Sequence, residues 1–75
     1  MPMLPLPAVD RDEEATIECL AAVGPLRARL HELGLLPGAR IRVVTAGSPC
    51  ILVVGGTTRL CLRAEEAESI LVQVG

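Results

Sequence analysis

Apolar residues recur with two different periods along this chain, and the change of period marks its elements. Leu26, Leu30 and Leu33 follow the i, i+4, i+7 spacing of one apolar helix face. Pro25 suits the first turn of a helix, where its missing N–H has no partner to lose. Gly34 favours the left-handed conformation that ends a helix. These residues predict a short amphipathic helix that stops at Gly34.

The other apolar runs are short and are separated by turn signals. Pro37-Gly38 fits the two central positions of a type II turn, and the alternation over residues 39–43 predicts a half-buried strand. Gly55-Gly56 separates the apolar runs 50–54 and 57–62, which predicts a tight hairpin.

Two more strands complete the predicted order. Residues 15–23 are expected to form the first strand, with three residues on one face: Ile17, Cys19 and Ala21. Residues 63–68 predict one helical turn, and residues 69–74 predict a last strand with Ile70, Val72 and Val74 facing inward. Short strands with intervening turns indicate a mainly β fold, which we expect to be a small SH3-like β-barrel of about five strands with an inserted short helix.

Seventy-five residues allow one domain, and a chain of this length buries only about 60% of its unfolded surface. Residues 1–8 contain three prolines and are expected to be an extended leader, with residues 9–75 as the domain. The N-terminal segment lacks the basic region of a signal peptide, and no run approaches a membrane span. A cytoplasmic protein is therefore expected.

The composition excludes several kinds of binding surface. The chain has no Phe, Tyr or Trp, so it lacks the side chains that line proline-rich-peptide grooves or stack single-stranded bases. Its seven arginines are outweighed by nine acidic residues, and the net charge of −2 argues against nucleic acid as a partner. A local cluster of arginines is still compatible with an acidic partner, since net charge does not describe local charge.

The candidate metal ligands and nucleophiles form no known pattern. The three cysteines include no CxxC pair and are expected to be reduced thiols: Cys19, Cys50 and Cys61. His31 and Glu32 are adjacent on the predicted helix, where neighbours do not converge on one ion. No serine has a histidine nearby in sequence, and no glycine-rich loop precedes a lysine. We therefore expect no metal site, no cofactor and no enzymatic activity.

One candidate partner-binding surface lies on the strand 50–54, which is apolar on both faces. If Leu52 and Val54 point outward, they lie between two pairs of residues on the neighbouring strands, which are Arg40 and Arg42 on one side and Arg59 and Cys61 on the other. The result is an apolar stripe with an arginine rim, which is typical of a docking surface. The alternative is that the leader folds over this stripe and completes the core. The same stripe is compatible with a homodimer.

A second candidate surface surrounds the predicted turn. Leu35 and Leu36 are consecutive apolar residues next to Pro37, and Arg27 and Arg29 lie on the preceding helix. At least one leucine is expected to be exposed and to contact a partner. The alternative is that one of them fills the end of the barrel.

Two blocks of sequence resemble one family. They are LRARLHELGLLPGARIRVV (residues 26–44), and GSP followed by an apolar strand, a glycine turn and LCLRAEEAESILV (residues 60–72). Together they resemble the FeoA family of ferrous-iron transport accessory proteins over roughly residues 15–74. The same module is similar to the C-terminal SH3-like domain of diphtheria-toxin-repressor-type regulators. The segment PLPAVDRDEEA departs from the family's usual leucine-rich start.

The resemblance implies a cytosolic accessory protein that docks on the membrane ferrous-iron permease through the permease's GTP-binding domain. Such a protein would lie at the inner face of the membrane only through its partner. Two alternatives remain open: a carrier that binds ferrous iron directly, and a stand-alone regulatory module that acts on a metal-dependent transcription factor.

Overall fold

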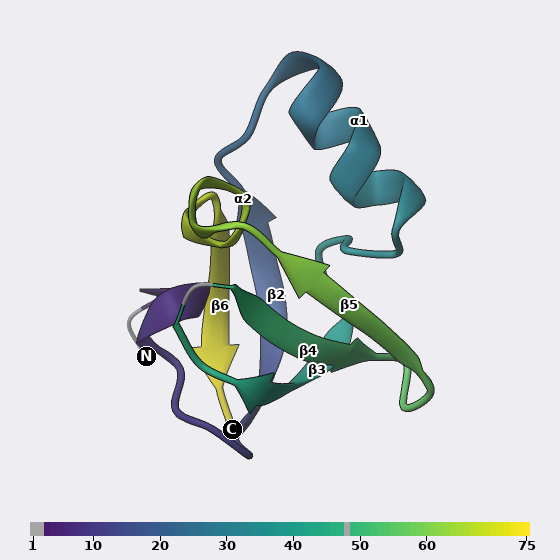
Figure 1. Ribbon diagram of the computed structural model, residues 1–75. Helices are drawn as coiled ribbons and strands as arrows, with labels where there is room; N and C mark the ends of the chain where they lie inside the picture. The colour runs from purple at the N-terminus through teal and green to yellow at the C-terminus, as the bar shows by residue number, and fades with distance from the viewer. Residues whose placement is uncertain (1–2, 48) are drawn as a thin grey trace.

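A computed structural model describes residues 3–47 and 49–75, and within these ranges the chain forms one antiparallel sheet of six strands (Figure 1). The strands are β1 (Leu4–Pro5), β2 (Glu14–Leu20), β3 (Arg40–Thr45), β4 (Cys50–Val54), β5 (Thr58–Leu62) and β6 (Ile70–Val74). A 3₁₀ turn, η1 (Leu6–Ala8), and two helices, α1 (Gly24–Glu32) and α2 (Ala64–Glu68), complete the fold. Met1 and Pro2 of the expected leader, and Ser48, lie outside the described residues.

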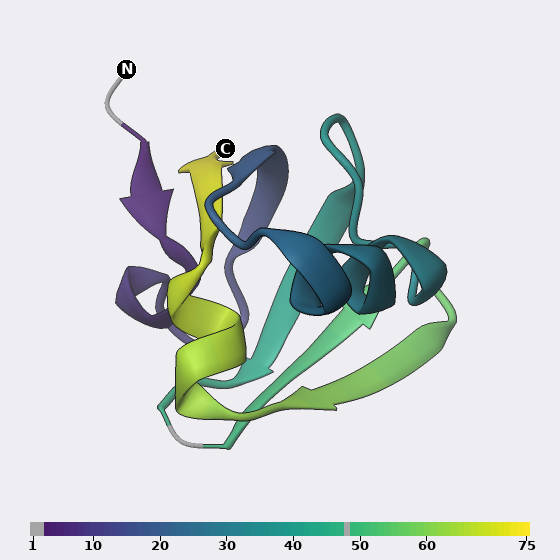
Figure 2. The same cartoon turned by 90° about the horizontal axis from the view of Figure 1, so that it is seen from above.

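The strand order β1-β6-β2-β3-β4-β5 places β1 and β5 at the two ends of a curled sheet. They do not pair with each other, so the sheet is not closed by hydrogen bonds. The helix expected between the first two predicted strands is α1, which joins β2 to β3. Both helices lie toward the same end of the sheet in Figure 1, and Figure 2 views that end from above.

The additional strand comes from the segment that was expected to be a separate leader. Leu4 pairs with Val72 of β6, and η1 packs against α2 and β6. Leu6 and Val9 are each only 1% exposed and belong to the core. The described part of this segment is therefore built into the sheet, and no structural break separates it from residues 9–75.

Helix α1 ends as its sequence predicts. Gly34 has a φ of +89° and donates its N–H to the carbonyl of His31 at 3.0 Å. Leu35 donates to the carbonyl of Leu30 at 2.9 Å, which completes a Schellman motif. This motif normally brings the residue after the glycine onto the last turn of the helix, and both Leu30 and Leu35 are fully buried.

The turn after α1 also forms as predicted. Ala39 donates its N–H to the carbonyl of Leu36 at 2.9 Å, and Gly38 has a φ of +91°. Gly38 donates in turn to the carbonyl of Ile17 at 2.7 Å, which attaches the turn to β2. The loop that leaves α1 is therefore bonded to α1 at its start and to β2 of the sheet at its end.

Strand β2 differs from its prediction because its pairing with β6 is irregular. Ile17 is buried, as is Ala15, but the register shifts between Ile17 and Cys19. This bulge breaks the alternation, since one extra residue changes which side chains face inward. Cys19 is consequently only partly buried, and Ala21, beyond the end of the strand, is exposed instead of inward.

The core consists of aliphatic side chains from every strand longer than two residues, together with α1, α2 and the N-terminal segment. Among the described residues, fifteen hydrophobic ones are buried: Leu6, Val9, Ala15, Ile17, Ala22, Leu30, Leu35, Ile41, Val43, Cys50, Leu52, Leu62, Ala67, Ile70 and Val72. Ile70 and Val72 confirm the inward face predicted for β6.

Candidate partner-binding surfaces

The outer face of the sheet carries a row of arginines on β3 and β5. Arg42 of β3 pairs with Val53 of β4, which pairs in turn with Arg59 of β5. Directly opposed residues of antiparallel strands share one face, so these three side chains lie side by side on the outside. Both arginines are exposed and Val53 is half-buried. With Arg40 and Ile51, which share their face, they form what we call the basic sheet face.

The outward residues of β4 are not those that the sequence predicted. Leu52 is fully buried because it pairs with the buried Val43, and Val54 pairs with the buried Ile41 and packs against the core. The residues that face outward are Ile51 and Val53. The expected docking role of Leu52 and Val54 is therefore corrected, whereas an apolar centre with an arginine rim is present.

The structure supports one part of the alternative in which the leader covers β4 and completes the core. The leader does complete the core, through Leu6 and Val9. Its described residues pair with β6, which β2 and β3 separate from β4 in the sheet. They therefore complete the core beside β6, which two strands separate from β4.

Around the turn after α1, the two leucines have opposite environments. Leu35 is 0% exposed and belongs to the hydrophobic core, whereas Leu36 is 43% exposed beside the exposed Pro37. Leu35 is thus unavailable to a partner, which corrects that assignment. Leu36, Pro37 and the exposed Arg27 remain an accessible surface.

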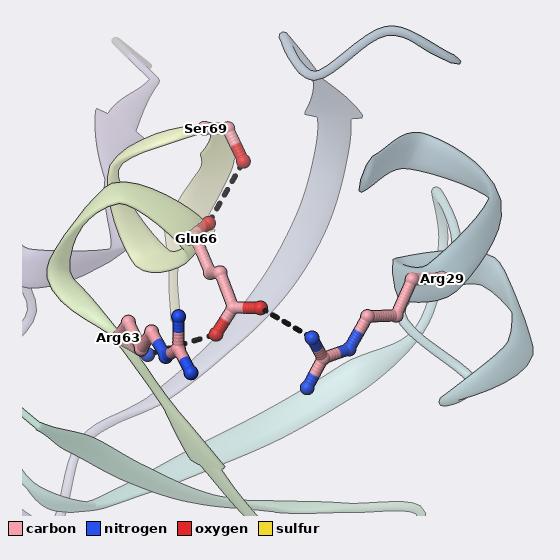
Figure 3. Close-up of polar contacts among 4 residues, drawn as sticks. All are labelled: Arg29, Arg63, Glu66 and Ser69. Carbon is pink, nitrogen blue, oxygen red and sulfur yellow. Dashed lines mark hydrogen bonds and ion pairs between the residues drawn. The ribbon is translucent and has the colours of Figure 1, made fainter. Parts of the chain in front are cut away.

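Arg29, expected at the same surface, has a partner within the chain. Its Nη1 lies 3.4 Å from Oε2 of Glu66, and the two side chains are 62% and 7% exposed (Figure 3). Oε1 of Glu66 accepts a hydrogen bond from the backbone N–H of Arg63 at 2.9 Å. Glu66 therefore caps the start of α2 and joins α2 to α1.

Glu66 was not identified from the sequence, although a local signal exists. A carboxylate at the third position of a helix commonly accepts the N–H of the residue before that helix. The spacing from Arg63 to Glu66 fits this pattern. The contact with Arg29 joins residues far apart in the sequence, so it has no local signature.

Replacement of Glu66 by alanine should destabilise the protein by about 1–3 kcal/mol, because a capping acceptor and an ion pair are both lost. Glu66→Gln keeps an acceptor for the Arg63 N–H and should cost less. Arg29→Gln should cost about 1 kcal/mol or less, since the arginine is largely exposed. Urea unfolding followed by circular dichroism measures these differences. The exposed Glu65, changed to alanine in the same helix, is the matched control; an equal loss there would contradict the assigned role of Glu66.

The thiols and the histidine do not converge. Among residues 3–47 and 49–75, no group of three or more His, Cys, Asp or Glu side chains is placed to hold a metal ion. Cys50 is buried and Cys61 is exposed on the outside of β5. Burial raises the pKa of the Cys50 thiol, and the nearby Cys61 adds to this effect, so Cys50 remains protonated and resembles an apolar core residue.

A comparison with protein families identifies the fold. The family model described as the FeoA domain matches residues 4–74. The chain belongs to the FeoA family. This family is associated with ferrous iron transport and consists of small accessory domains, not of enzymes. No curated protein matches the chain.

Solved structures of FeoA proteins agree with this assignment. An iron uptake regulatory protein, FeoA, is 25% identical, and the match covers 99% of this chain and 100% of that protein with a TM-score of 0.90. The FeoA of Stenotrophomonas maltophilia, solved in complex with zinc and described as a procaryotic SH3 domain protein, is 28% identical. That match covers 97% of this chain and 91% of the relative, with a TM-score of 0.80. The SH3-like fold expected from the sequence is thereby confirmed.

The expected relation to metal-dependent regulators is also confirmed at the level of the fold. IdeR of T. acidophilum is 20% identical, with a TM-score of 0.90; the match covers 100% of this chain and 35% of IdeR. No helix in the described part of this FeoA chain is both long and apolar enough to cross a membrane.

Proposed function

We propose that this FeoA protein docks on the cytosolic GTP-binding domain of the membrane ferrous-iron permease and thereby regulates iron uptake. The observation that carries the proposal is the basic sheet face, where the exposed Arg42 and Arg59 flank the half-buried Val53. Protein interfaces combine an apolar centre with arginine and exclude most other charged residues. This face is built from three adjacent strands, so it is rigid before a partner binds.

Direct iron carriage has less support in this structure. A ferrous-iron carrier needs several nitrogen, oxygen or sulfur ligands that converge on one point. The described residues contain no such group of three, and the buried Cys50 keeps its proton. Docking, in contrast, needs only the surfaces described above.

The proposal is tested by an amide NMR titration of the labelled protein with the isolated GTP-binding domain. Buffers should be reducing and free of iron, and the domain should be loaded in turn with GDP and with a non-hydrolysable GTP analogue. We expect localised shifts on β3, β4 and β5. No shift with either nucleotide, together with localised shifts on addition of ferrous iron, would replace docking by iron binding.

Charge reversal provides the corresponding affinity test. Arg59→Glu places a carboxylate on the rim of the basic sheet face, beside Val53, and should weaken binding about tenfold. Arg11→Glu is the matched control, because the Arg11 side chain is 78% exposed and forms its ion pair with the adjacent Asp12. Equal affinities for the two variants would remove the basic sheet face from the interface.

A further inference from the structure

A shallow groove crosses one end of the basic sheet face. Glu14 of β2, Arg40 and Arg42 of β3, Val53 of β4 and the hairpin glycines Gly55-Gly56 line it. Four consecutive segments of the sheet thus contribute to one hollow. Its chemistry is unusual for this acidic chain, because two arginines and one carboxylate surround a small apolar floor.

The single carboxylate in the groove is already engaged. Oε1 of Glu14 accepts a hydrogen bond from Nη2 of Arg40 at 2.9 Å, and both side chains are more than half exposed. Glu14 lies directly opposite Arg42 in the strand register, yet it pairs diagonally with Arg40. Within the part of the chain that the structure describes, the Arg42 side chain has neither an ion pair nor a hydrogen bond.

The hairpin leaves the end of the groove open. Gly55 and Gly56 have φ values of +64° and +83°, which a side chain disfavours, and a Cβ atom on either residue would meet no other atom within 4 Å. A partner chain can therefore approach the backbone here without displacing side chains. These glycines form the turn between β4 and β5, whose hairpin is seen in Figure 1, and they line the groove together with Arg42.

We propose that this groove binds a carboxylate side chain from an acidic, extended segment of a protein partner, and that Glu14 competes with that carboxylate. Arg42 is the primary ligand, because its planar guanidinium can hold a carboxylate through two parallel hydrogen bonds. Arg40 becomes a second ligand when Glu14 releases it. In the free protein, Glu14 thus binds the Arg40 guanidinium that the partner's carboxylate contacts in the complex.

A protein segment fits this groove better than a membrane or a nucleic acid. Those polyanions need a continuous basic surface, whereas Glu14 interrupts this one and the whole chain carries a net charge of −2. Val53 on the floor and Ile51 beside it offer apolar contact to the alternate residues of an extended segment. Identification of the partner as the permease's GTP-binding domain rests on the function proposed above, but the groove chemistry does not.

The direct test uses two defined probes. One is a blocked peptide of alternating glutamate and valine residues, and the other replaces every glutamate by glutamine. Amide NMR titrations of the full chain should show shifts at Arg42, Val53 and Gly55-Gly56 with the glutamate peptide only. The affinity should fall as salt is raised, because the contact is exposed to solvent.

Two substitutions should change the affinity for the glutamate peptide in opposite directions. Glu14→Gln removes the competitor and should tighten binding of the glutamate peptide about two- to fivefold. Arg42→Gln should weaken it by a similar factor. Arg11→Gln removes an exposed arginine outside the groove and should leave the affinity unchanged. All three residues are exposed, so amide spectra of the free variants should match the wild type beyond the changed positions.

Four results of the peptide titrations would overturn the inference. Equal binding of both peptides, shifts centred on Arg27 instead of Arg42, no shifts at all, or unchanged or weaker binding by Glu14→Gln would each exclude the proposed role of the groove. A GTP-binding domain that binds Arg42→Gln and Glu14→Gln like the wild type would overturn this inference and leave docking intact. If the GTP-binding domain binds neither the wild type nor any variant while the peptide results hold, only the docking proposal is refuted.

Discussion

Replacement of Leu35 by alanine should destabilise the protein by about 2–5 kcal/mol, whereas the same change at the adjacent Leu36 should cost less than about 0.5 kcal/mol. Leu35 is 0% exposed and packs at the end of α1, where the Schellman motif brings it onto the turn that contains Leu30. Leu36 is 43% exposed. Since a chain of this size has a total stability of only about 4–11 kcal/mol, the first variant should lose a large share of its stability.

Thermal and urea unfolding followed by circular dichroism measure this difference, because the chain lacks aromatic residues for fluorescence. The two variants remove the same atoms from neighbouring positions, so differences in composition cancel. A loss at Leu36→Ala equal to that at Leu35→Ala would show that both leucines are buried in solution. It would also remove Leu36 from the accessible surface beside Pro37.

The contrast between these two leucines shows how much of the structure the local sequence pattern predicts. Gly34 correctly predicts the end of α1, because a left-handed residue is needed there. The same motif also places the next residue, Leu35, against the helix. Burial of Leu35 therefore followed from a feature already visible in the sequence, through the contact that accompanies this helix end.

The orientation of strand β4 could not be predicted from the local sequence pattern. Every residue over 50–54 is apolar, so alternation gives no sign of which side faces the core. The orientation follows from the register with β3, where Val43 pairs with Leu52 and Arg42 with Val53. β3 has a clear alternation, but the pairing register depends on the bulge between Val43 and Thr45 and on the hairpin, which no local pattern specifies.

The Glu66–Arg29 contact required the tertiary structure for a further reason. The two residues lie on separate helices, and they meet only because the sheet carries both helices to the same end (Figure 3). Helical periodicity places Arg29 on the polar surface of α1 but cannot tell open solvent from a neighbouring carboxylate. A polar face was thus predictable, whereas its partner was not.

Replacement of Leu6 by alanine should also destabilise the protein by about 2–5 kcal/mol and lower its melting temperature by at least about 8 °C. The reason is that Leu6 is 1% exposed and lies in η1, which packs against α2 and β6. Met3 is 50% exposed in the same segment, so Met3→Ala is the matched control and should have little effect.

This prediction decides the status of the segment that precedes residue 9. If the segment were a detachable leader, Leu6→Ala would leave the melting temperature unchanged, and residues 9–75 would fold with the stability of the full chain. The buried Leu6 and Val9 instead predict that removal of residues 1–8 destabilises the whole domain and exposes apolar surface beside β6. Because β6 is separated from β4 by two strands, the basic sheet face should bind its partner through β3, β4 and β5 even where the N-terminal segment has loosened.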